Sequence, residues 1–443
     1  MEFAESDINR KSLRFSFLDG VFASVMIGIT QDYFTPFLLF LGGTSFQVGL
    51  LSAFPNMVAS LAQLRTAEFI RMLRSRKRTI TSFVFLQALM IGAIAFVALG
   101  GWSSVTIFIS LAVLFTTFGA IATPAWGSLM SDIVAGDRRG AYFGWRNSLL
   151  GCIVVMASFG AGILLHWIEP GRLREGFFAL FAAACVTRVA SWYFLTRMHD
   201  PEPAHHRGAR FDPLTFFEKL RSSNFARFVM FVSLMSFSVS MAAPFFAVLM
   251  IRDLRFNYLE YSVITATAPL VMYLMMGRWG RLADRIGNVR VLKFTAPIIA
   301  GVPLLWIAGR HPVYLFFAQV ISGFAWSGFQ LAASNFIFDA VAPDRRVKYI
   351  SYFNVLNGVL LSLGALLGGS LLSWLPGLLG LPILTLFAIS SGLRIVVSTA
   401  LPVGLKEVRA VDAIRGNELI FSLIGMRPMG IERKNNGGKG QGG

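Results

Sequence analysis

The stretch Asp132-Ile-Val-Ala-Gly-Asp-Arg-Arg139 returns 207 residues later as Asp339-Ala-Val-Ala-Pro-Asp-Arg-Arg346. Tyr142 and Asn147 have matches at the same offset, Tyr349 and Asn354. Self-similarity over such a distance indicates that the chain contains two equivalent units. The first copy follows the fourth apolar segment of the chain and the second copy follows the tenth. The repeat therefore predicts two six-helix halves in tandem.

The composition of the 443-residue chain is that of a membrane protein. Apolar residues make up 55% of it, charged residues 14%, and the mean hydropathy is +0.64. Soluble domains contain about 25% charged residues, and a membrane helix needs about 20 mostly apolar ones. We expect an all-α protein with twelve transmembrane helices near residues 15–41, 45–67, 79–99, 104–131, 141–167, 176–196, 226–250, 259–280, 290–309, 312–339, 349–374 and 382–403.

These spans divide the chain into four parts. We expect residues 1–196 to form the N-terminal half and residues 226–403 the C-terminal half. Between them, residues 197–225 form a polar linker with an amphipathic helix, and residues 404–443 form a polar, Gly-rich, disordered tail. Linker and tail both fall on the same side of the membrane as the N-terminus.

The net charge of +17 follows from topology rather than from a nucleic-acid partner. With the N-terminus inside, 32 of the 40 Lys and Arg residues fall in inside segments and five in outside loops. Such a bias sets orientation, and the basic loops face an anionic inner leaflet of membrane lipids. We therefore expect both termini in the cytoplasm. Short outside loops and only two cysteines favour the bacterial cytoplasmic (inner) membrane.

A loop after the eighth span carries a family signature. The stretch Gly280-Arg-Leu-Ala-Asp284-Arg285-Ile-Gly287-Asn-Val-Arg290 resembles the loop motif of the major facilitator superfamily. Together with the repeat, the resemblance covers about residues 10–403. The corresponding first-half stretch, Leu64–Arg71, keeps an acid but lacks the glycines. The resemblance implies a secondary transporter whose halves alternate access to a central cavity for a small-molecule substrate. No subfamily matches, and we expect a monomer.

Charged residues beside these loops are candidate gates. A carboxylate just past a helix end can pair with an arginine or accept bonds from another helix start. We expect a cytoplasmic gate at the loop motif and a secondary gate at the two copies of the repeat. The residues are Gly280, Asp284, Arg285, Gly287 and Arg290 for the first, and Asp132, Arg138, Arg139, Asp339, Arg345 and Arg346 for the second.

Asp32 is the candidate proton carrier. It lies about 27 Å beyond Arg14 along the first span, and an ionisable group inside a membrane is costly. Its counterpart in the second half is Ser240, so the repeat does not require the carboxylate. It could load and release a proton as access alternates. The alternative is a fixed, hydrogen-bonded aspartate near the outer mouth.

Polar residues in the spans predict a substrate cavity. The candidates are Gln31, Tyr33, Gln330, Asn335 and Asn357, and amides suit an uncharged or zwitterionic solute. Asp19 is expected to have a structural or gating role. Arg188 and Arg394 occupy equivalent positions of the repeat, which indicates a shared architectural role, with stems that snorkel towards headgroups.

Other classes of protein have less support. The chain has no Gly-x4-Gly-Lys-Ser/Thr loop for ATP, no metal or cofactor spacing and no Ser/His/Asp set, so we do not expect an enzyme. A non-transporting membrane sensor or assembly protein on a transporter fold remains the alternative.

Overall fold

The computed structural model describes residues 7–100, 104–134, 139–201, 224–341 and 346–408. This part is helical, and its only β pairing is an isolated bridge between Leu378 and Leu381. The helices of the first half are α1 (Asp7–Phe40), α2 (Ser45–Ala62), η1 (Gln63–Arg65), α3 (Thr66–Leu73), α4 (Arg76–Leu99), α5 (Val105–Ile133), α6 (Arg139–Trp167), η3 (Pro170–Arg172) and α7 (Leu173–Thr196). Those of the second half are α9 (Asn224–Val248), η4 (Leu249–Asp253), α10 (Tyr258–Ile286), α11 (Asn288–Ala308), α12 (Pro312–Ala340), α13 (Arg346–Leu371), α14 (Pro382–Ala400) and η5 (Leu401–Gly404).

The helices have the length and composition that a membrane requires. Within the described residues, 11 helices are long and apolar enough to cross a bilayer. The remaining predicted span, the second at residues 45–67, corresponds to α2, which has 18 residues and continues through η1 into α3. The expected all-α membrane fold is therefore confirmed. The predicted amphipathic helix of the linker lies outside the described residues.

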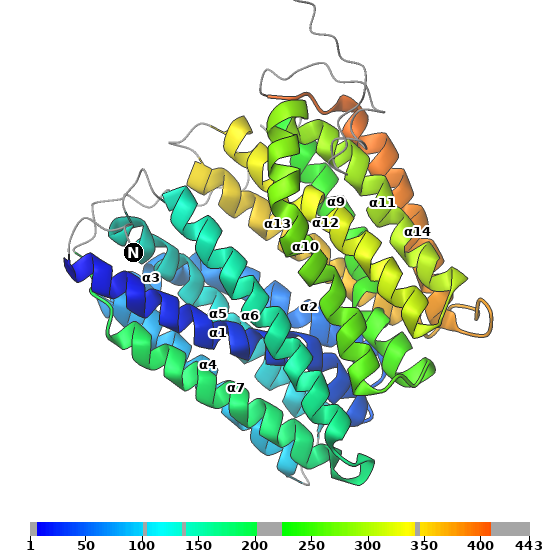
Figure 1. Ribbon diagram of the computed structural model, residues 1–443, viewed down its shortest axis with the longest axis horizontal. Helices are drawn as coiled ribbons and strands as arrows, with labels where there is room; N and C mark the ends of the chain where they lie inside the picture. The colour runs from blue at the N-terminus through cyan, green and yellow to red at the C-terminus, as the bar shows by residue number, and fades with distance from the viewer. Residues whose placement is uncertain (1–6, 101–103, 135–138, 202–223, 342–345, 409–443) are drawn as a thin grey trace, which may run out of the picture.

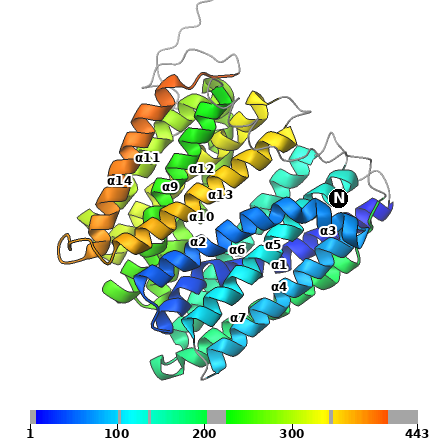
Figure 2. The same cartoon turned by 180° about the vertical axis from the view of Figure 1, so that it is seen from behind.

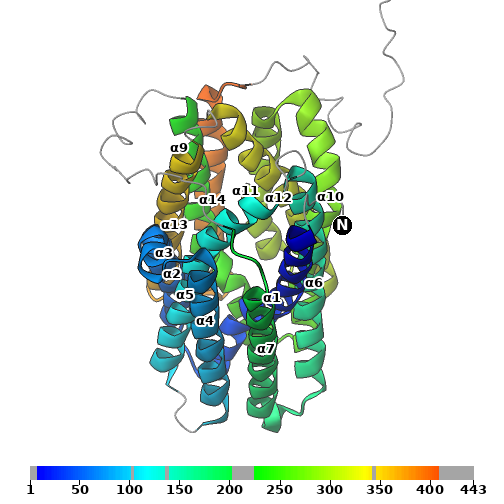
Figure 3. The same cartoon turned by 90° about the vertical axis from the view of Figure 1, so that its left-hand side faces the viewer.

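The same packing plan is used twice. In the first half α4 packs against α5 and α7, and α1 packs against α6 and α7. In the second half α11 packs against α12 and α14, and α9 packs against α13 and α14. Figure 3 looks at the first half from its outer side, with α4 and α7 in front. The tandem repeat seen in the sequence is thus a repeat in space.

Two helix pairs hold the halves together. α2 packs against α13, and α6 packs against α10 (Figures 1 and 2). The first contact is close because glycines face each other. A Cβ on Gly49 would lie 2.8 Å from the carbonyl oxygen of Ala365 and 3.0 Å from the Cα of Gly369. In the second contact, a Cβ on Gly151 would collide with the ring of Tyr273.

The two ends of the bundle differ. We call the end where α1, α4 and α11 begin the basic end, since the arginine-rich loops lie there, and the end where α1 finishes the far end. The halves meet at the far end and their helices diverge towards the basic end (Figure 1). At the far end α1 is anchored by aromatic packing, because Phe37 contacts Phe108, Phe177 and Phe181 with ring centroids 4.9 to 5.1 Å apart.

Candidate transport site and gates

Asp32 lies where three helices of the two halves meet. The Ser158 hydroxyl on α6 donates to its Oδ2 at 2.5 Å, and the Tyr261 hydroxyl on α10 donates to its backbone oxygen at 2.6 Å. Tyr33 and Tyr261 pack edge to face with ring centroids 5.9 Å apart. Among the described residues, no Lys, Arg or His forms an ion pair with Asp32. A half-buried carboxylate therefore sits at the contact between the halves without a basic partner.

The neighbours of Asp32 have different surroundings. Gln31 is exposed on α1, one turn from Ile27, which is 39% exposed. Tyr33 is fully buried and its hydroxyl donates to the Ser158 carbonyl oxygen at 2.8 Å. Gln31 is thus exposed in this conformation, whereas Tyr33 belongs to the closed contact at the far end.

The predicted cavity amides of the second half do not form one cluster. Gln330 on α12 is exposed and lies about 180° around the helix from Ile321, at 100° per residue. Asn335 points elsewhere, since it lies within about 20° of Phe324 on the same helix. Asn357 on α13 is half-buried, and its Oδ1 has no hydrogen-bond partner in the described part of the chain.

The loop motif forms the turn between α10 and α11. Gly287 has a φ of +93°, and its N–H donates to the Ala283 carbonyl oxygen at 2.9 Å. A side chain there would be strained, which explains the glycine. Asp284 and Arg285 are exposed on the last turn of α10, and Arg290 is half-buried in the first turn of α11. Gly280 lies one turn before Asp284, with Leu331 of α12 beside it.

The repeat aspartates bind the start of a neighbouring helix. Asp132 at the end of α5 forms an ion pair with Arg76 of α4 at 2.6 Å. Its counterpart Asp339 accepts a hydrogen bond from the Asn288 side chain of α11 at 2.8 Å. The arginines predicted to pair with these aspartates lie outside the described side chains: Arg138, Arg139, Arg345 and Arg346.

A second pair of acids completes both clusters, and the sequence analysis missed it. Asp200, after α7, accepts from the backbone N–H of Lys77 at 3.2 Å and lies 3.5 Å from Arg76. Glu407, after η5, accepts from the backbone N–H of Val289 at 2.7 Å. The two acids are 207 residues apart, the same offset as the repeat. A search for further acids at this offset would have found them.

Buried arginines brace the interior of each half. Arg188 donates to the Gln87 side chain, at 2.8 Å through Nε, and to the Ser191 hydroxyl at 3.0 Å. Ser191 donates in turn to Asp19 at 2.6 Å. Arg394 donates to Ser390 and to the carbonyl oxygens of Ile299 and Val239. The snorkelling prediction is wrong, because both arginines are buried and internal acceptors satisfy them.

In the described part of the chain, the helices form two repeated halves that are in contact at one end. The sequence model of the Major Facilitator Superfamily matches residues 228–426. This match covers most of the second half, and the loop motif from Gly280 to Arg290 lies inside it. No curated protein sequence matches the chain.

Solved structures of transporters share the fold. The chain is similar to the nucleoside transporter NupG, with a TM-score of 0.67 and 16% identity over 89% of this chain and 98% of that one. A bacterial homologue of the human lysosomal transporter Spinster, in an inward-facing and unoccupied conformation, has a TM-score of 0.65 and 16% identity over 90% of this chain and 97% of that one. The human organic anion transporter MFSD10 (TETRAN) has a TM-score of 0.61 and 16% identity over 89% of this chain and 100% of that one.

Proposed function

We propose that the protein is a proton-coupled secondary transporter that moves a small polar solute by alternating access. It would act as a monomer in the bacterial cytoplasmic membrane, with both termini and the basic end in the cytoplasm. The orientation rests on the distribution of Lys and Arg. The conformation described is then the one open to the cytoplasm. Residues 1–196 and 226–403 would move as the two rocking halves, joined by the linker at 197–225.

The position of Asp32 is the observation that carries proton coupling. Its backbone oxygen receives the Tyr261 bond across the two halves, so the opening of the far end must break that bond. Its carboxylate is then beside the contact that opens and closes. A group in that place exchanges protons with one side of the membrane in each state, as alternating access requires. Ser158 can donate to the ionised form and accept from the protonated one.

The two acid clusters at the basic end would act as the complementary gate. In the state open to the far end, the halves must close at the basic end, where the loop motif and the repeat aspartates lie. Asp284, Arg285 and Arg290 then contribute charges that can latch the first half. A latch has to break in each cycle, so a net energy of about 1–3 kcal/mol is appropriate.

The solute we infer is uncharged or zwitterionic. Gln31 and Gln330 present exposed amides from opposite halves, and an amide offers both donors and acceptors. Asn357 adds an oxygen without a partner in the described part. The likeness to a nucleoside transporter makes nucleosides the first class to test, ahead of organic anions.

The test measures uptake into proteoliposomes together with thermal unfolding. Nucleosides, amino acids, sugars and organic acids are screened first, since a ligand at a hundred times its Kd stabilises by about 2.7 kcal/mol. For the ligand found, an imposed pH gradient should drive accumulation by wild type. Asp32→Asn should abolish this response but retain solute exchange without a gradient. Asp7→Asn, at an exposed acid, is the matched control.

The outcomes separate the alternatives. A pH response in Asp32→Asn equal to that of wild type would remove the proton role and leave the fixed aspartate. Well-folded protein with no ligand and no transport, but with a stable protein partner, would instead support the membrane sensor.

A further inference from the structure

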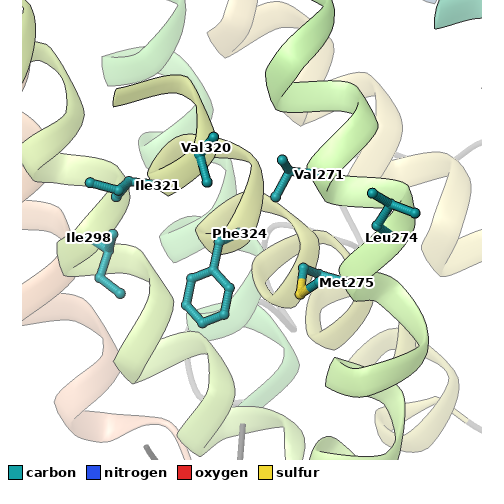
Figure 4. A pocket seen from close by; sticks show the side chains of 7 residues that line it. All are labelled: Val271, Leu274, Met275, Ile298, Val320, Ile321 and Phe324. Carbon is teal, nitrogen blue, oxygen red and sulfur yellow. The ribbon is translucent and has the colours of Figure 1, made fainter. Parts of the chain in front are cut away.

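An apolar groove runs along the outer surface of the second half. It is formed by Val271, Leu274 and Met275 of α10, Ile298 of α11, and Val320, Ile321 and Phe324 of α12 (Figure 4). Its volume is about 450 Å³, which is within the usual size of a ligand pocket. The side chains around it carry no charge and no hydrogen-bonding group other than the Met275 sulfur.

The groove faces the lipid rather than the central pathway. Leu274 is 64% exposed and Ile321 is 43% exposed, and such side chains belong in hydrocarbon. Gln330, the exposed amide of α12, lies on the opposite side of that helix. Gly323 lets α12 approach α10 closely, so α12 lies at the bottom of the groove. A Cβ on Gly323 would lie 2.3 Å from the Ala268 carbonyl oxygen.

Arginines continue the lining of the groove towards the basic end. Arg278, Arg281 and Arg285 follow Leu274 at i+4, i+7 and i+11, so they share its face of α10. All three are exposed. A guanidinium nitrogen of Arg278 lies 3.5 Å from the Sδ of Met275, which lines the groove. The charged face and the apolar groove are therefore continuous.

The spacing fits inside one leaflet of a bilayer. From Leu274 to Arg278 and Arg281 the helix rises about 6–10 Å, at 1.5 Å per residue. The hydrocarbon of a bilayer is about 30 Å thick, so one leaflet contributes about 15 Å. A lipid with its phosphate at these two arginines would thus place part of an acyl chain in the groove.

We propose that this groove is a binding site for one anionic phospholipid of the leaflet at the basic end. One acyl chain fills the space between α10, α11 and α12, and Arg278 and Arg281 bind the phosphate and an anionic headgroup. A zwitterionic lipid would fill the groove equally well but would gain less from the arginines. A bound lipid would join α10, a helix of the contact between the halves, to α11 and α12.

The first half provides a matched control. Arg65 is an exposed arginine in η1, which directly follows α2 at the basic end. The packing of α2 on α5 corresponds to that of α10 on α12. No second and third arginine follow it at i+3 and i+7, where Glu68 and Met72 stand instead. Arg65→Gln therefore removes one comparable charge from the same end of the bundle without touching the proposed site.

Native mass spectrometry of delipidated protein tests the proposal directly. The probes are phosphatidylglycerol and phosphatidylcholine with equal chains, added at equal concentrations. We expect wild type to retain one phosphatidylglycerol in preference to phosphatidylcholine. Arg278→Gln/Arg281→Gln should weaken phosphatidylglycerol binding about tenfold and remove the preference. Val320→Trp, which fills the groove, should weaken binding of both lipids. Arg65→Gln should behave as wild type.

The remaining outcomes overturn the proposal. Equal binding of phosphatidylglycerol by wild type and by the double arginine variant would show that the lipid binds elsewhere. Unchanged lipid retention in Val320→Trp would show that no chain occupies the groove. Competition by glycerol phosphate as strong as by the intact lipid would indicate a free-phosphate site. None of these results depends on transport, so the proposed function is tested separately.

Discussion

At the scale of single residues, one hydroxyl joins the halves beside the candidate proton carrier. Tyr261→Phe removes the hydrogen bond to the Asp32 backbone oxygen but keeps the ring that packs on Tyr33. A hydrogen bond contributes about 1 kcal/mol net, so the population closed at the far end should fall about fivefold relative to the other state. The measurement is alkylation of Gln31→Cys, with Cys152 and Cys185 replaced by serine, from each side of the membrane.

The direction of labelling decides the result. Tyr261→Phe should slow alkylation from the basic end and speed it from the far end. Tyr258→Phe is the control, because it also removes a hydroxyl from α10 but keeps the ring that packs on Phe177, with ring centroids 6.1 Å apart. If both variants label as wild type does, the Tyr261 bond does not influence the conformational equilibrium.

The buried link between Asp19 and Arg188 makes a stability prediction. The Ser191 hydroxyl accepts from Arg188 and donates to Asp19, so the two charged groups are joined through Ser191. Asp19→Asn removes the negative charge of this link, but Arg188 retains Gln87 and Ser191 as acceptors, so we expect a loss of about 1–3 kcal/mol. The double variant Asp19→Asn/Arg188→Met should recover part of the loss. Thermal unfolding in detergent measures both, and an additive double variant would refute coupling between the two residues.

Residue-level reasoning from the sequence reached Asp32 but not its partners. A carboxylate in an apolar span is conspicuous because it is expensive. Ser158 and Tyr261 were not identified, since hydroxyl residues are common in membrane helices and need no special partner. The snorkelling prediction for Arg188 failed for a related reason: sequence position shows depth, but not that Gln87 and Ser191 supply acceptors inside the half.

At the scale of elements, an acid that follows the last helix of each half caps the start of a neighbouring helix. Asp200 caps α4 and Glu407 caps α11. Glu407→Ala removes the acceptor for the Val289 N–H at the start of α11 and should cost about 1 kcal/mol. Asp200→Ala should cost more, because Asp200 also lies close to Arg76. Thermal unfolding gives the totals, and hydrogen exchange at residues 288–292 and 76–80 localises each effect to its own helix.

The amide of the same size as the acid is the control for these caps. Glu407→Gln keeps an acceptor oxygen and should lose less than Glu407→Ala. Equal exchange rates in all variants would show that the first turns of α4 and α11 do not need their caps.

Helix positions could be predicted because the length of an apolar segment determines a membrane span. For example, α12 differs from its predicted range by one residue at one end. The caps could not be predicted, since the chain after the last helix of each half is polar and has no distinctive pattern. Only the 207-residue offset relates Asp200 to Glu407. Gln330 and Asn335, five residues apart on α12, lie about 140° apart around the helix. This angle alone would have shown that the two amides do not share one face of the helix.

At the scale of the whole molecule, the repeat predicted two six-helix halves, and family and fold agree with it. The conformational state could not be read from the sequence, because both states of the proposed alternating-access cycle would use the same helices. It depends on small differences between contacts such as Gly49 with Gly369 at one end and charged clusters at the other. The substrate is hidden for a similar reason, since exposure of Gln31 and Gln330 follows from how the halves separate.

A cross-link at the far end tests the rocking movement itself. The Arg252 guanidinium of the second half donates to the Ser45 hydroxyl of the first at 3.0 Å, so the two positions are adjacent when this end is closed. Ser45→Cys/Arg252→Cys, in a background without native cysteines, should be joined by a short bifunctional thiol reagent. The cross-linked protein should lose net transport at least tenfold, because the far end cannot open, yet bind solute from the basic end with unchanged affinity. Reduction of a cleavable reagent should restore transport. Full transport with complete cross-linking would show that the halves do not separate at this end, and alternating access by rocking would then have to be abandoned for this protein.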